Sequence, residues 1–234
     1  MKKFLFLFIC LLSFFIVSEE KGYAQNIEKE YLTEEFLRSL TIDDFVVANV
    51  IIESRFDITQ LTEDELNEQA ALVLNEIYQN KIIPFANNND LPETYGGLNK
   101  WEIAIAILSP FQATQVYSAS NAAKKATATF FQNPKADDHN GNAFKHSYWN
   151  GLMMKKMSES DTQLWADAHE MSSTNDLATA MDLYNNAYGR NVYKTLGKPT
   201  DAQLSAKLLN DITKGQLKRV VNNKLIGTNG TGRN

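Results

Sequence analysis

The chain has 234 residues, of which 44% are hydrophobic and 22% charged, a composition typical of a folded globular protein. Its formal net charge is −5, and its basic residues are scattered along the sequence. This charge and its distribution argue against a nucleic-acid-binding protein.

The first 24 residues have the pattern of a signal peptide. Two lysines precede an apolar run from Phe4 to Val17, and a polar stretch then ends in the small residues Gly22 and Ala24. The run is shorter than the roughly 20 residues that a membrane-spanning helix needs, and no later stretch is apolar enough to span. We therefore expect residues 1–24 to be removed, no transmembrane segment to remain, and the mature protein to be exported to the periplasm or the cell exterior.

Cysteine occurs once, at Cys10, within this predicted signal peptide. The mature chain therefore has no cysteine, which excludes disulfides, thiolate metal sites and a cysteine nucleophile. Its stability must come from packing alone.

The segment 25–94 begins with helical patterns. Thr33, Thr41 and Thr62 each precede acidic residues, an arrangement that caps the first amides of a helix and suits the helix dipole. Before the loop predicted at 81–100, apolar residues recur at helical spacing: Leu66, Ala70, Val73, Leu74 and Ile77. We expect an N-terminal helical segment of uncertain role that either covers the rest of the protein, docks a partner or extends the core.

Residues 95–221 are predicted to form the main helical domain. Proline at position 110 starts a second helix directly after a first one, as its missing amide donor permits. The expected helices cover residues 101–108, 110–131, 141–157, 160–172, 175–196 and 201–221. The tail 222–234 is expected to be disordered. Since no alternating pattern with hairpin turns is evident, the predicted fold is all-α, a multi-helix, bundle-like globular domain.

Three of these helices place polar residues on the face that should point inward. At 100° per residue, His146 shares a quadrant with Trp149, and Asn142 and Asn150 flank it. His169 lies at the edge of the next apolar stripe. On the third helix, Asp182 and Asn186 share an arc with apolar residues, and Asn185 lies at its margin. A buried carboxylate needs a partner, and the candidates for Asp182 are His146, His169 and Arg190.

Each of these residues also has a purely structural interpretation. A single inward histidine is more often a satisfied core residue than a catalyst, and buried amides commonly fix the register between helices. Gly189 could serve only to let two helices approach closely. Two inward histidines with two carboxylates and several amides exceed what register requires, which favours a functional cleft.

The sequence resembles an uncharacterised bacterial family, one of the domains of unknown function. The motifs are "NAFKHSYWNGLMMKK", "WADAHE" and "ATAMDLYNNAYGR", preceded by "SPFQATQVY". The family occurs in exported proteins and as a C-terminal module of wall-associated or toxin-like proteins, and the resemblance covers residues 95–196. It implies a role for Asn142, His146, Trp149, Asn150, His169, Glu170, Asp182, Asn185, Asn186, Gly189 and Arg190. In the family, arginine is more usual at the position of Lys145 and histidine at that of Tyr184, so a role that needs a third imidazole at position 184 is not expected.

The first hypothesis is a hydrolase with a histidine as general base. His146 or His169 would take the proton, oriented by Glu170 or Asp182, because imidazole titrates near neutral pH. Six further residues would bind the substrate or a developing oxyanion: Asn142, Trp149, Asn150, Asn185, Asn186 and Arg190.

A divalent metal is the possible cofactor, and no cofactor is certain. Its ligands would be His146, His169 and Asp182, with Glu170 activating water. This variant is weaker, because "HEMSST" lacks the second histidine of a zinc-protease helix. A calcium loop in "DDHNGN" is rejected on spacing. A serine nucleophile has little support, because the sequence has no Gly-x-Ser-x-Gly motif and Ser147 should point away from His146.

The second hypothesis is a non-catalytic exported binding or scaffold domain, whose partner the sequence does not identify. The two differ in geometry. Convergence of His146, His169 and Asp182 within about 6 Å at an open cleft favours catalysis, because charges couple strongly over that distance. Side chains that lie apart, or that are sealed from solvent and satisfied by one another, favour a binding or scaffold domain.

Overall fold

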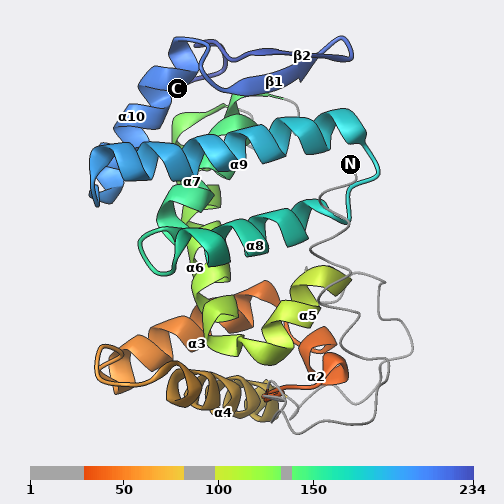
Figure 1. The fold of residues 1–234 in the computed structure, drawn as a ribbon, viewed down its shortest axis with the longest axis vertical. Helices are drawn as coiled ribbons and strands as arrows, with labels where there is room; N and C mark the ends of the chain where they lie inside the picture. Colours follow the sequence, from red (N-terminus) through yellow and green to blue (C-terminus); the bar gives the residue numbers. More distant parts are fainter. Residues whose placement is uncertain (1–28, 82–97, 133–138) are drawn as a thin grey trace, which may run out of the picture.

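The protein is built from helices with one small β-hairpin (Figure 1). The computed structural model describes residues 29–81, 98–132 and 139–234. The predicted signal peptide, most of the predicted loop at 81–100 and the segment 133–138 lie outside the described residues. The elements are α2 (Glu34–Arg38), α3 (Ile42–Arg55), α4 (Glu63–Lys81), α5 (Lys100–Leu108), α6 (Pro110–Phe130), α7 (Asn140–Met153), α8 (Glu159–Glu170), α9 (Asp176–Leu196), α10 (Asp201–Thr213), β1 (Lys218–Val221) and β2 (Lys224–Gly227). The prediction of an all-α fold is confirmed.

The helix starts follow the capping residues of the sequence. Thr33 and Thr41 cap α2 and α3 through their side chains, and Thr41 forms a reciprocal capping box with Asp44. Thr62 and Glu65 exchange the same pair of hydrogen bonds at the start of α4. Pro110 occupies the first turn of α6. These predictions are therefore confirmed.

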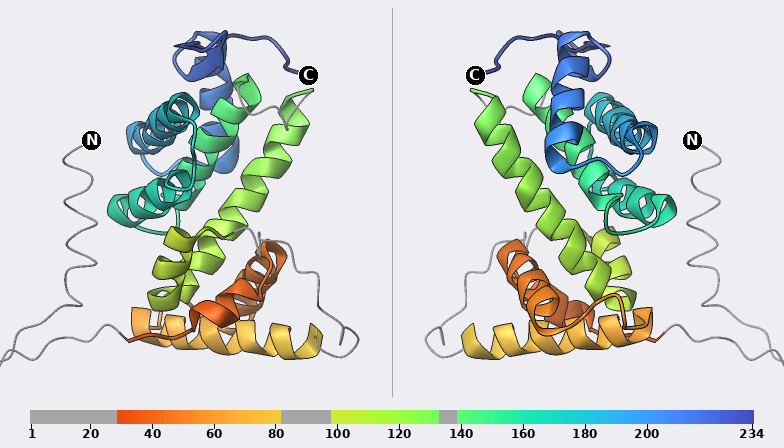
Figure 2. Two further views of the ribbon diagram at one scale, coloured as in Figure 1. Left: turned by 90° about the vertical axis from the view of Figure 1, so that its right-hand side faces the viewer. Right: turned by 90° about the vertical axis from the view of Figure 1, so that its left-hand side faces the viewer.

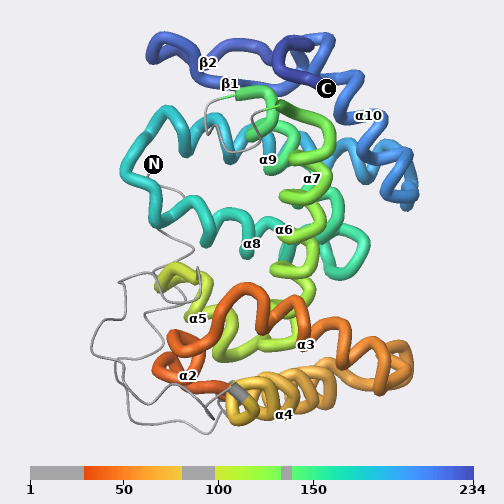
Figure 3. Tube along the Cα trace, turned by 180° about the vertical axis from the view of Figure 1, so that it is seen from behind, coloured from red at the N-terminus to blue at the C-terminus, as the bar shows by residue number. Residues whose placement is uncertain are grey.

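Helix α6 joins two layers of the molecule. Helices α3, α4 and α5 pack against α6 in one layer, which α2 joins through α5, and α7 packs against α6 in the other layer, which also holds α8 to α10 and the hairpin (Figures 1 and 2). Viewed from behind, the path of α6 leads upward from the layer of α3 and α4 (Figure 3). The buried hydrophobic side chains form one continuous core across both layers, including Phe45 and Ile52 of α3 and Leu208 of α10. The predicted N-terminal segment thus shares its core with the predicted main domain.

Helices α7 and α9 touch at the level of their backbones. Gly189 of α9 lies against Ser147 of α7, and a Cβ built on this glycine would lie 1.9 Å from the Ser147 carbonyl oxygen. Only glycine allows this approach. The close helix contact proposed for Gly189 is confirmed, and it brings the polar faces of the two helices together.

The C-terminal region differs from the prediction. Helix α10 ends at Thr213 rather than at 221, because Gly215 takes a positive φ of 76° and reverses the chain. Residues 218–227 form an antiparallel hairpin, whose turn residues Asn222 and Asn223 both have positive φ.

The tail predicted to be disordered is held in place. Its last residues return to the end of α6, where the Asn234 amide donates to the Phe130 carbonyl and the Gln132 amide donates to the Gly232 carbonyl. Asn140 at the start of α7 also donates to the Asn229 side chain. Side-chain amides and backbone pairing thus order a segment whose only large apolar residues are Leu225 and Ile226.

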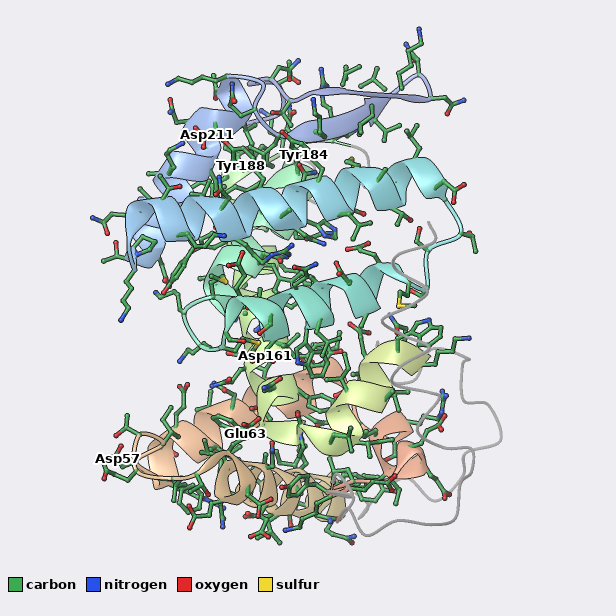
Figure 4. All side chains as sticks on the ribbon, in the orientation of Figure 1. Asp57, Glu63, Asp161, Tyr184, Tyr188 and Asp211 are labelled. Atoms are coloured by element: carbon green, nitrogen blue, oxygen red, sulfur yellow. The ribbon has the colours of Figure 1, made fainter. Side chains whose placement is uncertain are left out.

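The upper face of α9 contacts α10 and the hairpin through tyrosines (Figure 4). Tyr188 donates to the buried Asp211 of α10, and Tyr184 donates to the Gln216 carbonyl. Tyr184 therefore lies on the other side of α9 from Asp182, and a histidine there would not reach the polar cluster. Among the described helices, none has the length and apolar character needed to cross a bilayer.

Candidate functional site

Three side chains from three helices meet below α9. His146 comes from α7, Glu170 from the last turn of α8 and Asp182 from the second turn of α9. The His146 Nδ1 atom lies 3.3 Å from Glu170 Oε1, and its Nε2 atom lies 3.5 Å from Asp182 Oδ1. All three side chains line a pocket of about 300 Å³, together with Asn142 and His169. One imidazole therefore stands between two carboxylates at the wall of a pocket.

A chain of amides fixes the orientation of His146. Arg190, which can only donate, bonds to Asn150 Oδ1 at 2.7 Å. The Asn150 Nδ2 atom therefore donates to Asn186 Oδ1 at 2.8 Å, and Asn186 Nδ2 donates to Glu170 at 3.1 Å. Since Asn186 Oδ1 is an acceptor, the His146 Nδ1 atom 3.3 Å away is the donor. When neutral, His146 therefore carries its proton on Nδ1 and presents the lone pair of Nε2 to Asp182.

Asp182 and Asn142 form the side of the site opposite Glu170. Asn142 Nδ2 donates to Asp182 Oδ1 at 3.1 Å. The Oδ1 atom of Asn142 is buried and has no hydrogen-bond partner, although the residue is only 4% exposed and lines the pocket. An unsatisfied buried acceptor costs about 1–3 kcal/mol, so this atom calls for a ligand or water.

His169 belongs to a second carboxylate pair at the same pocket. Its Nδ1 atom lies 2.9 Å from Oε1 of Glu102, a side chain from α5 that is 1% exposed. The other oxygen of Glu102 accepts from the Asn99 amide in the capping box that starts α5. Asn99 also donates to the Ala168 and His169 carbonyls, which ties α5 to the end of α8. His169 itself is 45% exposed on its side chain.

The two histidines lie side by side. Their ring centroids are 6.3 Å apart, and the indole of Trp149 packs edge-on against both, at 6.4 Å from His146 and 5.2 Å from His169. The Trp149 Nε1 atom donates to the Val116 carbonyl of α6. Trp149 thus supports the two rings from behind and is held rigidly itself.

The carboxyl groups of the site differ in their affinity for protons. Burial raises the pKa of Asp182 to about 6, and the nearby charge of Glu170 acts in the same direction. Burial also opposes the charge of Glu170, but the hydrogen bond and charge of His146 outweigh it and lower the pKa of Glu170. Burial opposes the charge of His169, and its Glu102 partner outweighs this and raises the pKa of that imidazole.

The structure gathers most of the residues that the sequence singled out. His146, Glu170, Asp182, Asn142 and Asn186 are in direct contact or linked by one hydrogen bond, with His169 beside them. Asn150 and Arg190 lie one step further from the pocket and hold Asn186. These residues form a connected network of side chains from α7, α8 and α9.

The structure places two of the predicted residues outside the cluster formed by His146, Glu170 and Asp182. The ligand atoms that lie within 4.8 Å of one another come from His146, Glu170 and Asp182, so Glu170 takes the place that was predicted for His169, whose Nδ1 is taken by Glu102. Asn185 lies outside the cluster, because its side chain both donates to and accepts from the backbone of Lys218 in β1.

Glu102 is a residue of the site that the sequence analysis missed. Its spacing from Asn99 is a capping-box signal and could have predicted the helix start. Nothing in that local pattern indicates a partner 67 residues away in His169. The pairing depends on how α5 meets α8.

Comparison with known proteins agrees with the resemblance in general terms. Residues 103–216 match the family model described as a domain of unknown function (DUF6973). The matched domain starts and ends later than the resemblance at 95–196, and it contains His146, His169, Glu170 and Asp182. Glu102 lies one residue before it. No curated protein and no solved structure matches the chain.

Proposed function

We propose that the protein is a hydrolase in which His169 acts as the general base on a water molecule in the pocket. The observation that supports this most strongly is the Glu102–His169 pair, in which a buried carboxylate accepts from Nδ1. Within the described part of the chain, the Nε2 atom of His169 takes part in no hydrogen bond. A histidine held in this way is oriented and keeps one nitrogen for a proton.

The two histidines differ in their suitability as the base. His146 is 5% exposed, and protein side chains lie within hydrogen-bonding range or close to it at both ring nitrogens. His169 is far more accessible and lines the same pocket. His169 is therefore the imidazole that a substrate and its water can reach.

The proposed reaction conserves atoms and charge. His169 Nε2 takes a proton from water as the water oxygen attacks the carbonyl carbon or phosphorus atom of the substrate. The bond to the leaving group then breaks, and the imidazolium returns the proton to the leaving oxygen or nitrogen. Glu102 stabilises the imidazolium between the two steps. General acid–base catalysis by a histidine typically raises the reaction rate about 10²–10⁴-fold.

The test is a hydrolysis screen with matched histidine variants. Purified protein would be assayed on chromogenic carboxylic esters, phosphate monoesters and phosphodiesters. H169N should lower kcat at least 100-fold, E102Q should lower it about tenfold and change the pH profile, and H139N should leave it unchanged because His139 lies outside the pocket. Absence of hydrolysis in the wild-type protein, or full activity in H169N, would contradict the proposal.

A non-catalytic binding domain is the alternative, and the fully buried side chains of Asn150 and Asn186 favour it. Their hydrogen bonds are complete within the protein, as expected of groups that fix helix register. If the screen finds no hydrolysis while the protein remains folded, this alternative gains.

We also propose that the protein is exported. The proposal rests on the lysines, apolar run and small residues of positions 1–24. N-terminal sequencing of the protein from fractionated cells should find it outside the cytoplasm and starting at Gln25. Recovery of the intact chain from the cytoplasm would refute export.

A further inference from the structure

We propose that His146, Glu170 and Asp182 form a binding site for one divalent first-row metal ion, with Zn²⁺ and Mn²⁺ as the ions of choice. The role of the metal rests on the proposed function, because the ion would lie in the pocket beside His169, the proposed base. Binding itself can be measured without any substrate. The metal-site proposal and the hydrolase proposal can therefore fail independently of each other.

The spacing of the three side chains suits a metal. Two ligands at about 2.1 Å from a tetrahedral ion lie about 3.4 Å apart. The His146 Nε2 and Asp182 Oδ1 atoms are 3.5 Å apart, and one ligand atom from each of the three residues lies within 4.8 Å of the others. Glu170 Oε1 lies 3.3 Å from Nδ1 rather than from Nε2, so the Glu170 carboxylate would have to rotate toward Asp182 to reach an ion bound at Nε2.

The protonation pattern leaves a place for a cation. In the neutral form of His146, the amide chain from Arg190 places the ring proton on Nδ1, so that Nε2 faces Asp182 with a lone pair. Asp182 Oδ1 is also an acceptor. Two acceptors at 3.5 Å repel each other unless a proton or a metal ion lies between them.

The residues around the three ligands have the form of a metal site's outer shell. A metal-bound histidine usually donates its second ring N–H to a carbonyl or carboxylate, which sets its tautomer. Here Asn186 Oδ1 accepts from His146 Nδ1, while the amide of Asn186 holds Glu170. One asparagine therefore orients two of the three ligands, and Asn142 holds the third.

Asn142 supplies an independent observation. Its Oδ1 atom is buried, lacks a partner and belongs to a residue of the pocket lining. An amide oxygen is a good ligand for a divalent cation and a good acceptor from a metal-bound water. A bound ion would thus satisfy a polar atom that the protein leaves unsatisfied.

The ligand set points to the type of metal. One imidazole and two carboxylates are borderline and hard donors, which suit Zn²⁺ or Mn²⁺ better than a soft ion such as Cu⁺. When bound, the ion would lower the pKa of a coordinated water. His169 would then receive the proton of that water, with its ring 6.3 Å from that of His146.

Calorimetry on EDTA-treated, untagged protein tests the proposal. Titration with ZnCl₂ and MnCl₂ should show one site with a Kd below about 10 μM for at least one of them, and the ion should raise the Tm. D182N and H146Q should weaken binding at least 100-fold, and N186A about 10–100-fold. D167N and H139N are controls that change a nearby carboxylate and another histidine, and both should bind as the wild type does.

The outcomes separate this inference from the proposed hydrolase. H169N should lose hydrolysis but bind the metal with unchanged stoichiometry. Metal binding without hydrolysis in the wild type supports the site and contradicts the hydrolase. Wild-type protein that binds neither ion, or D182N that is folded by circular dichroism and binds as tightly as wild type, overturns the site. If D182N does not fold, the folded N186A variant decides the question. Weaker metal binding by N186A supports the site, and unchanged metal binding overturns it.

Discussion

Asp182 is the residue whose charge is least favoured in the site. Its carboxyl is mostly buried, and its pKa is about 6 against an unfolded value near 3.8. The ionisable groups that face it are His146 and Lys145 on α7 and Glu170 and His169 on α8. The folded protein therefore binds more protons than the unfolded chain between about pH 4 and pH 6, so Asp182 makes stability fall as the pH rises through this window.

Replacing Asp182 with asparagine should remove this pH dependence. Asparagine stays neutral, so the free energy of unfolding of D182N relative to wild type should rise by about 2–3 kcal/mol between pH 4 and pH 7. Urea denaturation of both proteins at pH 4, 5, 6 and 7 in EDTA would measure it. The lowered pKa of Glu170 changes the stability below about pH 4.5, and the raised pKa of His169 changes it above about pH 6.5. Neither group therefore accounts for a change in stability across the window of Asp182. A constant difference between D182N and wild type would contradict the role of Asp182.

Gly189 makes a steric prediction at the same scale. A methyl group there would overlap the Ser147 carbonyl, so G189A should push α9 away from α7 and destabilise the protein by about 3 kcal/mol. G141A is the matched control, because its Cβ would meet Phe131 at 3.4 Å and Thr127 at 3.6 Å, both ordinary van der Waals distances. Thermal melting should show a large loss for G189A and little change for G141A. Equal melting temperatures would mean that the helices can separate without cost.

Helical periodicity predicted the inward residues, and it could not predict their pairing. The 100° rule places His146, Asp182 and Asn186 on buried faces from local sequence alone. The partner of each side chain depends on the positions of α8 and α9 along α7. The close approach at Gly189 helps to fix these positions. For this reason the sequence suggested His169 as a possible metal ligand beside His146 and Asp182, whereas in the structure the third residue of the cluster is Glu170.

At the scale of whole elements, capping signals were more informative than composition. The threonine caps marked the starts of α2, α3 and α4, because a side-chain acceptor at that position satisfies free amides. The hairpin escaped prediction, because strands of four residues carry little periodic signal. Its Asn222-Asn223 turn was the available signal, since asparagine tolerates positive φ.

The hairpin depends on Asn185 for its attachment to α9. The Asn185 side chain pairs with both backbone groups of Lys218, as a neighbouring strand would. N185A should therefore cost about 2 kcal/mol and speed hydrogen exchange in β1 and β2. Affinity for Zn²⁺ or Mn²⁺ should not change, because Asn185 does not reach His146. Weaker metal binding in N185A, with the hairpin amides still protected, would show that Asn185 belongs to the site after all.

At the scale of the molecule, the site depends on both layers. Glu102 and Asn99 at the start of α5 belong to the layer that packs on α2, and they hold His169 and the end of α8. Helix α6 continues from one layer into the other with buried side chains along its length. The two layers should therefore unfold together, although the sequence suggested a boundary near residue 94.

Core truncations in each layer test this cooperativity. Ile52 in α3 and Leu208 in α10 are both fully buried, and each change to alanine should cost about 2–5 kcal/mol. Because one core joins the layers, I52A and L208A should each shift a single transition, seen alike by far-UV circular dichroism and by tryptophan fluorescence. Trp101 of α5 would be replaced by phenylalanine in all proteins compared, so that the fluorescence reports only Trp149 and Trp165 in the upper layer. If I52A instead produced an early loss of helix signal while the fluorescence transition stayed at the wild-type temperature, the layers would be independent. Glu102 would then hold His169 only when the lower layer is folded, and activity would disappear before the metal site does.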